Sequence, residues 1–145
     1  MDVLTIENTR FKFKNFSGNK FGNGGASTFN VIIEDANDAM QLKNDGWNIK
    51  EDDYDPENPV YHLPVEISFK YSKYAPNIHI VENGRMIGRI DENNIADLDD
   101  FDIESCDIQI TPFEWERNGN SGVKAYLKSM YVVLHEDPLA RKYRR

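Results

Sequence analysis

Rings and cations alternate along one segment near the C-terminal end of the chain, residues 106–136, which reads CDIQITPFEWERNGNSGVKAYLKSMYVVLHE. Two alternating runs flank a turn rich in Gly and Asn, a pattern that predicts a long β-hairpin. Successive side chains of a strand point to opposite faces of a sheet. A face with aromatic rings among Lys and Arg suits single-stranded nucleic acid, because rings stack on bases and cations contact phosphates.

We expect a register in which Arg117 faces Gly122 across a four-residue loop, Asn118–Ser121. Residues that face each other share one side of the sheet. One side then collects rings and cations: Phe113, Trp115, Arg117, Lys124, Tyr126 and Lys128. The other side has core character and holds Ile108, Ile110, Pro112, Leu127, Ser129 and Tyr131. Two interpretations of the first side stay open: a binding surface, or a second small core with lysines extending outward past packed rings.

A second strip of the same kind, Arg10–Phe16 (RFKFKNF), lies near the N-terminus. Alternation places its cations and one ring on a common face, which holds Arg10, Lys12, Lys14 and Phe16. Lys20 extends this strip into a glycine-rich loop. The alternative is an ordinary solvated outer face. Two such strips in one small chain favour a binding surface.

Reactive residues are not arranged as in an enzyme. The three histidines lack metal-site spacing, and there is neither a glycine-rich phosphate loop nor a nucleophile elbow. We therefore expect no enzymatic activity, no cofactor and no metal site. The single cysteine, Cys106, allows no internal disulfide, and its place in the core register predicts a buried free thiol.

Charge is distributed unevenly along the 145 residues. The net charge is −8, which taken alone argues against nucleic-acid binding. Acidic residues concentrate in Glu51–Glu57 and Asp91–Asp107, whereas basic residues concentrate in Arg10–Lys20, Arg117–Lys128 and the last five positions. Local basic strips on an acidic body can still bind phosphates, and the acidic remainder limits non-specific adhesion.

Most of the chain in front of the final hairpin also predicts strands. The expected strands are Val3–Glu7, Arg10–Phe16, Thr28–Glu34, Val60–Phe69, Asn77–Glu82 and Met86–Ile90. The Asn83-Gly84 step between the last two is a strong hairpin signal.

Helices are expected to be few and short. Asp35 can cap a helix over Ala36–Asn44, and Gly46 suits its end. Trp47 then anchors this helix to the core. One or two helical turns are expected in Glu92–Leu98, and a brief helix in Leu139–Tyr143.

These elements predict a mainly β fold, with five or more strands and one or two short helices, in a closed or half-open β-barrel. The length predicts a single domain, 1–145. An acidic loop at 50–59 and a short basic tail at 138–145 complete it. The 39% hydrophobic content suffices for a core, no apolar run approaches the ~18 residues of a membrane span, and the first residues are unlike a signal peptide. We expect a cytoplasmic protein without a membrane partner.

Four segments, taken in order, resemble a group of bacteriophage single-stranded DNA-binding proteins with an OB-like β-barrel. They are Phe13–Gly18, Phe29–Glu34 followed by Leu42 and Asp45–Lys50, Ile110–Trp115, and Gly122–Val132. The resemblance implies an OB-like fold and places both strips, at Lys12–Phe16 and Phe113–Lys128, in a binding groove.

The same resemblance implies the biological setting. Single-stranded DNA would be coated with low sequence specificity during phage replication or recombination, in the host cytoplasm. Phage replication or recombination proteins would be further partners, and a homodimer or a cooperative assembly on DNA is compatible with it. One departure matters: many replication proteins of this type end in an acidic tail that recruits partners, whereas this chain ends in ARKYRR. The basic end would favour a DNA contact over recruitment.

Two other functions remain in competition with DNA binding. The acidic runs also suit a DNA mimic that blocks a host nuclease or defence protein. A small β-barrel also suits a structural component of a phage particle.

Overall fold

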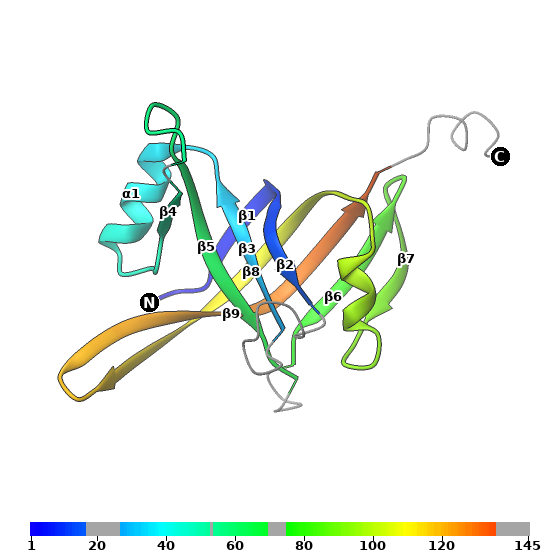
Figure 1. The fold of residues 1–145 in the computed structure, drawn as a ribbon. Helices are drawn as coiled ribbons and strands as arrows, with labels where there is room; N and C mark the ends of the chain where they lie inside the picture. The colour runs from blue at the N-terminus through cyan, green and yellow to red at the C-terminus, as the bar shows by residue number, and fades with distance from the viewer. Residues whose placement is uncertain (17–26, 53, 70–74, 136–145) are drawn as a thin grey trace.

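Strands make up most of the described part of the protein, and one α-helix and a 3-10 turn accompany them (Figure 1). The computed structural model describes residues 1–16, 27–52, 54–69 and 75–135. Its elements in chain order are β1 (Leu4–Thr9), β2 (Phe11–Asn15), β3 (Ser27–Ile33), α1 (Ala36–Asn44), β4 (Lys50–Asp52), β5 (Val60–Ile67), β6 (Asn77–Glu82), β7 (Arg85–Ile90), η3 (Ile95–Asp99), β8 (Ile103–Arg117) and β9 (Asn120–Leu134). The predicted mainly β class is confirmed. The predicted helix at Leu139–Tyr143 and the basic tail lie outside the described residues.

The sheet follows the hydrogen-bonded order β1-β8-β9-β5-β3-β2, with β4 on β5 and β6 on both β7 and β9. Its two ends, β1 and β2, are consecutive in the chain and meet at Arg10. The amide of Ile32 in β3 donates to the Arg10 carbonyl at 2.9 Å. Among the described residues no ladder joins β1 to β2, so the sheet curls toward a barrel without closing by strand pairing.

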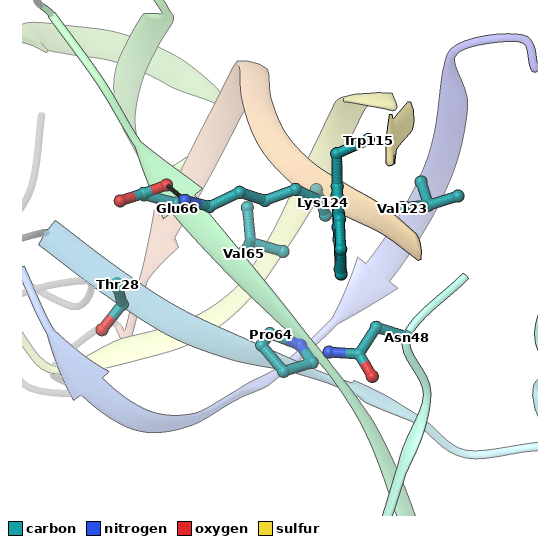
Figure 2. A pocket seen from close by; sticks show the side chains of 9 residues that line it. Thr28, Asn48, Pro64, Val65, Glu66, Trp115, Val123 and Lys124 are labelled. Carbon is teal, nitrogen blue, oxygen red and sulfur yellow. Dashed lines mark ion pairs between the residues drawn. The ribbon is translucent and has the colours of Figure 1, made fainter. Parts of the chain in front are cut away.

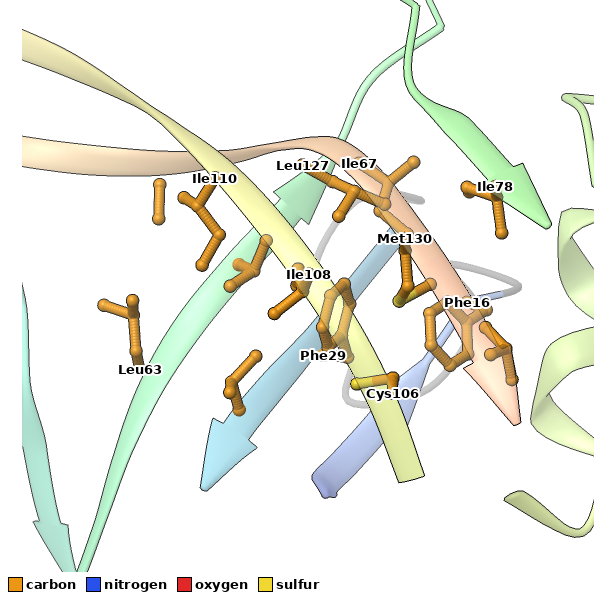
Figure 3. Packing of buried hydrophobic residues seen from close by; sticks show 14 of the residues in the cluster. Phe16, Phe29, Leu63, Ile67, Ile78, Cys106, Ile108, Ile110, Leu127 and Met130 are labelled. Carbon is orange, nitrogen blue, oxygen red and sulfur yellow. The ribbon is translucent and has the colours of Figure 1, made fainter. Parts of the chain in front are cut away.

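The core lies inside this curled sheet (Figure 3). Alternate positions of β3 and β5 point inward, so that Phe29 and Val31 meet Val65 and Leu63 across the two strands. Cys106 is fully buried on β8, as predicted from its register. Burial raises the pKa of its thiol far above the ordinary value, and the neighbouring Asp107 carboxylate adds to that effect. The thiol is therefore a neutral packing group.

The α1 helix begins and ends where predicted. The Asp35 side chain accepts hydrogen bonds from the amides of Asn37 and Asp38, the arrangement of an N-cap. At the other end Gly46 has φ +109°, and the Trp47 amide donates to the Leu42 carbonyl, as in a Schellman motif. Trp47 is only 5% exposed, which confirms its predicted role as a core anchor.

The final hairpin forms, but its register differs from the predicted one by two residues. Arg117 pairs with Asn120, so the turn is the two-residue Asn118-Gly119. Both turn residues have positive φ, 53° and 81°, as a type I′ turn requires and as Asn-Gly favours. A shift of two residues preserves side-chain parity, so Trp115 now faces Gly122 and Phe113 faces Lys124 on the same side as predicted.

The predicted core face of β9 is wrong beyond a β-bulge in this strand. Ile110 pairs with Leu127 but Gln109 pairs with Ser129, so Lys128 is the extra residue. Beyond the bulge the alternation is reversed. Met130 points into the core, whereas Tyr131, predicted to be core, is 42% exposed.

The tip half of this hairpin extends beyond the curled sheet (Figure 1). Within the described residues, positions 111–117 pair only with positions 120–126. The one further strand pairing of this half is between Tyr126 and Glu66 of β5. We call residues 111–126 the arm. The two strands of the arm pair with each other, whereas residues 129–133 of β9 lie between β8 and β6.

The predicted acidic loop is partly a strand. Residues 50–52 form β4, whose Glu51 pairs with Tyr61 of β5, and an irregular segment follows at 54–59. β4 could not be predicted from the sequence, because three residues are too few to show an alternating pattern. In the described part of the chain, none of the helices is long and apolar enough to cross a membrane.

Candidate nucleic-acid interface

The outward face of the arm carries two exposed rings. Phe113 is 55% exposed and Trp115 is 41% exposed. Both project from β8 on the side opposite the buried Ile108 and Ile110. Isolated large apolar residues on a surface are common, but two rings on one strand face, two positions apart, make a contiguous apolar strip suited to stacking.

The remaining predicted arm residues surround these rings. Phe113 meets the half-buried Tyr126 edge to face, with ring centroids 6.1 Å apart. The Lys124 ammonium lies 5.3 Å from the centroid of the Tyr126 ring, a cation–π distance. Arg117 is exposed beside the turn, and Lys128 is exposed at the bulge. The structure thus brings the five predicted arm residues to one side of the hairpin, and Lys128 lies next to the arm at the bulge.

Lys124 already has an anionic partner. Its Nζ lies 2.7 Å from Oε2 of Glu66 on β5, and the two side chains are 49% and 23% exposed (Figure 2). The Glu66 carboxylate, which accepts from the Lys124 ammonium, is the largest cause of the raised pKa of Lys124, and Tyr126 contributes further. Lys124 is therefore fully charged at neutral pH, but part of its charge is neutralised within the protein.

A hollow lies between the arm and the body of the sheet (Figure 2). Its volume is about 260 Å³, and its walls come from β3, β5, the segment after α1, and the arm. Trp115 points into it from β8, toward Pro64 of β5 and Asn48. The Lys124–Glu66 ion pair lies at its rim.

The N-terminal strip does not form a matching surface. Arg10 forms an exposed ion pair with Glu34 at 2.6 Å. Lys14 directs its Nζ to the carbonyls of Asp99 and Phe101, at 3.4 and 3.3 Å. Arg10 and Lys14 therefore both have partners within the chain.

The predicted place of Phe16 on the binding face is wrong, because its ring is fully buried instead of exposed. The register between β2 and β3 shifts between Lys12 and Asn15, and this irregularity turns Phe16 toward the core. There it stacks on Phe29 with centroids 5.2 Å apart. The Phe16 amide donates to Asp99, which ties the end of β2 to η3.

Two predicted residues of this strip are not placed as side chains. The backbone of Lys12 pairs with Asn30 of β3, and its side chain is outside the description. Lys20 also lies outside the described residues.

The structure adds a ring pair that the sequence did not reveal. His79 of β6 stacks on Tyr131 with centroids 5.0 Å apart and an interplanar angle of 22°. Arg89 of β7 pairs with His79 and donates to Asn77. The stack of His79 on Tyr131 depends on the parallel pairing of β6 with β9, which no local sequence pattern predicts.

Within residues 1–16, 27–52, 54–69 and 75–135, no cluster of three His, Cys, Asp or Glu is arranged to hold a metal ion. The Asp99 carboxylate of η3 has a structural contact instead, because it accepts the hydrogen bond from the Phe16 amide at the end of β2. What the described surface offers is rings and cations, the groups that contact bases and phosphates.

Sequence comparison connects this geometry to a family. The whole chain, residues 1–145, matches the family described as "Putative phage ssDNA-binding domain". The chain belongs to this family. This family agrees with the resemblance seen in the sequence. No curated protein sequence matches the chain.

Solved structures support the fold. The single-stranded DNA-binding protein from bacteriophage Enc34, in complex with ssDNA, superposes with a TM-score of 0.56 at 16% identity, over 94% of this chain and 88% of that one. Another structure of the Enc34 single-stranded DNA-binding protein gives a TM-score of 0.55 at 15% identity, over 99% of this chain and 87% of that one. At these identities the likeness concerns the fold, which is therefore OB-like as predicted.

Proposed function

We propose that this member of the phage ssDNA-binding family binds single-stranded DNA through the outward face of its arm. Phe113 and Trp115 stack on bases, Tyr126 supports them, and Arg117, Lys124 and Lys128 contact phosphates. The low sequence specificity follows from the chemistry, because every base offers a flat face for stacking.

The observation that carries this proposal is the exposure of Phe113 and Trp115 beside cations on the arm, where Ala125 is the only buried residue. In a second small core, both rings would be covered. Here they remain 55% and 41% exposed among the described residues, which favours a surface that is covered only by a ligand.

The net charge of −8 restricts where DNA can bind. Phosphates are repelled by most of an acidic surface and attracted only where cations are concentrated. Binding is therefore confined to the arm and its immediate neighbours. Coating of single strands in phage replication or recombination, alone or with phage proteins as partners, belongs to the same proposal, as does assembly of several copies on one strand.

A strand-preference titration tests the proposal. A labelled single-stranded oligonucleotide, the matching duplex and an RNA of the same sequence are each titrated at about 50 and about 200 mM salt. We expect single-stranded DNA to bind better than duplex, and its affinity to fall steeply with salt because counterions are released. Absence of binding at the lower salt, or binding that ignores salt, would refute it.

Capture experiments separate this function from the two competing ones. A DNA mimic would bind a protein from host lysate and ignore the oligonucleotide, and a structural component would be found in purified particles. The family membership favours single-stranded DNA binding over both competing functions.

A further inference from the structure

The hollow beneath Trp115 is a feature that the arm face alone does not explain. We propose that it binds a single nucleobase of the DNA strand, with Trp115 as one wall and Pro64 as the other. This inference rests on the proposed function, since the base is part of the strand that crosses the arm.

The size of the hollow suits a small flat ligand. Sites for drug-sized molecules measure about 300–1,000 Å³, and this hollow, at about 260 Å³, lies just below that range. Its lining is mainly apolar, from Val65, Val123 and Ala125 in addition to Trp115 and Pro64. An apolar slot next to an exposed indole is suited to the face of a base, whereas a phosphate would be repelled by Glu66 at the rim.

The position of the Trp115 ring depends on Gly122, its partner across the hairpin. A Cβ atom at position 122 would lie 2.8 Å from Cζ2 and 2.9 Å from Cε2 of Trp115. These distances are shorter than real contacts, so the indole occupies the space that any other residue would fill. Gly122 has no positive φ, so its backbone does not require glycine. We therefore assign to Gly122 the role of a positioning residue, which lets Trp115 lie across β9.

Asn48 supplies the polar contact of the site. It follows the buried Trp47, is exposed, and lies at the rim opposite the Lys124–Glu66 pair (Figure 2). Within the described residues its carboxamide makes no hydrogen bond, so both its donor and its acceptor are available. A carboxamide can complement the edge of any base because its donor and acceptor lie side by side. This site therefore contacts a base without selecting one.

A pair of alanine substitutions tests the role of Gly122. In Gly122→Ala the new methyl group displaces the indole, and we expect affinity for single-stranded DNA to fall roughly 5- to 100-fold, the loss of about one stacked base. Gly88→Ala is the matched control, because Gly88 also lies in a strand and has nothing within 4 Å of its Cβ position. It is expected to leave affinity unchanged.

A double variant removes the concern that Gly122→Ala merely disturbs the hairpin. If the methyl group acts by moving Trp115, Trp115→Ala with Gly122→Ala should bind no more weakly than Trp115→Ala alone. Additive losses would show that Gly122 acts through something other than the indole, and would overturn this part of the inference.

Asn48 is tested by a change of base preference. Asn48→Ala should weaken oligo-dT and oligo-dC equally, by a few-fold. Asn48→Asp leaves only acceptors at position 48, so it should favour oligo-dC, whose N4 amino group donates, over oligo-dT. Equal binding of both oligonucleotides by Asn48→Asp, with the wild-type affinity, would show that no base edge approaches position 48.

The outcomes distinguish the two proposals. If the wild-type chain does not bind single-stranded DNA, the proposed function fails. If the wild type and Gly88→Ala bind alike and Gly122→Ala binds equally well, the function stands and the nucleobase site fails.

Discussion

The arm and the N-terminal strip carry the same pattern of rings and cations, but the fold uses them differently. In the arm, Phe113 and Trp115 stay exposed and cations lie beside them. In the N-terminal strip, Phe16 is fully buried, Arg10 forms an exposed ion pair with Glu34, and Lys14 contacts backbone carbonyls. The difference shows that alternation identifies the two sides of a strand, whereas the neighbouring strands decide which side becomes surface.

The position of each strip in the sheet explains the outcome. β2 lies against β3 and is held at its end by η3, so an irregularity in its register turns a ring into the core. The arm extends past its neighbours, and its ring-and-cation face meets the body through the Lys124–Glu66 ion pair and the hollow beneath Trp115, while both rings stay exposed. A pattern of this kind therefore predicts binding best where a hairpin leaves the body of the fold.

The largest expected difference between the two regions concerns stability. Phe16→Ala removes a fully buried ring that stacks on Phe29, and we expect it to lower the free energy of unfolding by about 3–5 kcal/mol. Chemical denaturation measures the change, with Phe113→Ala as the matched control. If Phe16→Ala kept full stability but lost DNA binding, the contrast between the strips would be wrong.

The next effect concerns affinity. Phe113→Ala and Trp115→Ala should each weaken binding to single-stranded DNA by about 1–3 kcal/mol, because each removes one stacking ring. Their unfolding free energies should change by no more than about 0.5–1 kcal/mol, as for exposed positions. Fluorescence titrations and thermal melts of the same preparations check both halves; a loss of stability that parallels the loss of affinity would indicate a core role.

A smaller effect is expected from the acid that shares the site with Lys124. Glu66→Gln frees the Lys124 ammonium for a phosphate, so DNA should bind more tightly and the salt dependence should steepen by about 0.7 in its logarithmic slope. The gain should vanish when Lys124→Gln is added. An unchanged slope in Glu66→Gln would mean that Lys124 does not reach the DNA backbone.

The smallest effect belongs to the N-terminal strip. Arg10 is exposed and paired with Glu34, and such pairs contribute about 0–1 kcal/mol to stability. Arg10→Gln should therefore leave both the melting temperature and the affinity nearly unchanged, whereas Arg117→Gln at the arm should reduce affinity and flatten its salt dependence. A larger loss from Arg10→Gln would restore this strip to the binding surface.

Local signals predicted much of the fold. Asp35 and Gly46 delimit α1, Asn83-Gly84 turns between β6 and β7, and Trp47 anchors the helix. Each of these depends on residues within a few positions of one another. The ring-and-cation side of the arm was also predicted, because an error of two residues in register leaves every side chain on its own face.

What could not be predicted depends on distant strands. The bulge at Lys128 and the irregularity before Asn15 reverse the faces of Tyr131 and Phe16, and neither has a local sequence signal. The contact of Glu66 with Lys124, like the stack of His79 on Tyr131, needs the parallel pairing of β5 and β6 with β9. Sequence periodicity gives the chemistry of a strand but not the identity of its neighbours.

The self-paired arm also bears on how relatives of this protein can diverge. Because positions 111–126 pair almost entirely with each other, an insertion there leaves the barrel untouched. Two residues added to each strand keep every ring on its face and lengthen the arm by about 7 Å, whereas a single added residue would turn the strip over. Under the proposed function, insertions in pairs would adjust the length of DNA that one copy covers, independently of the core.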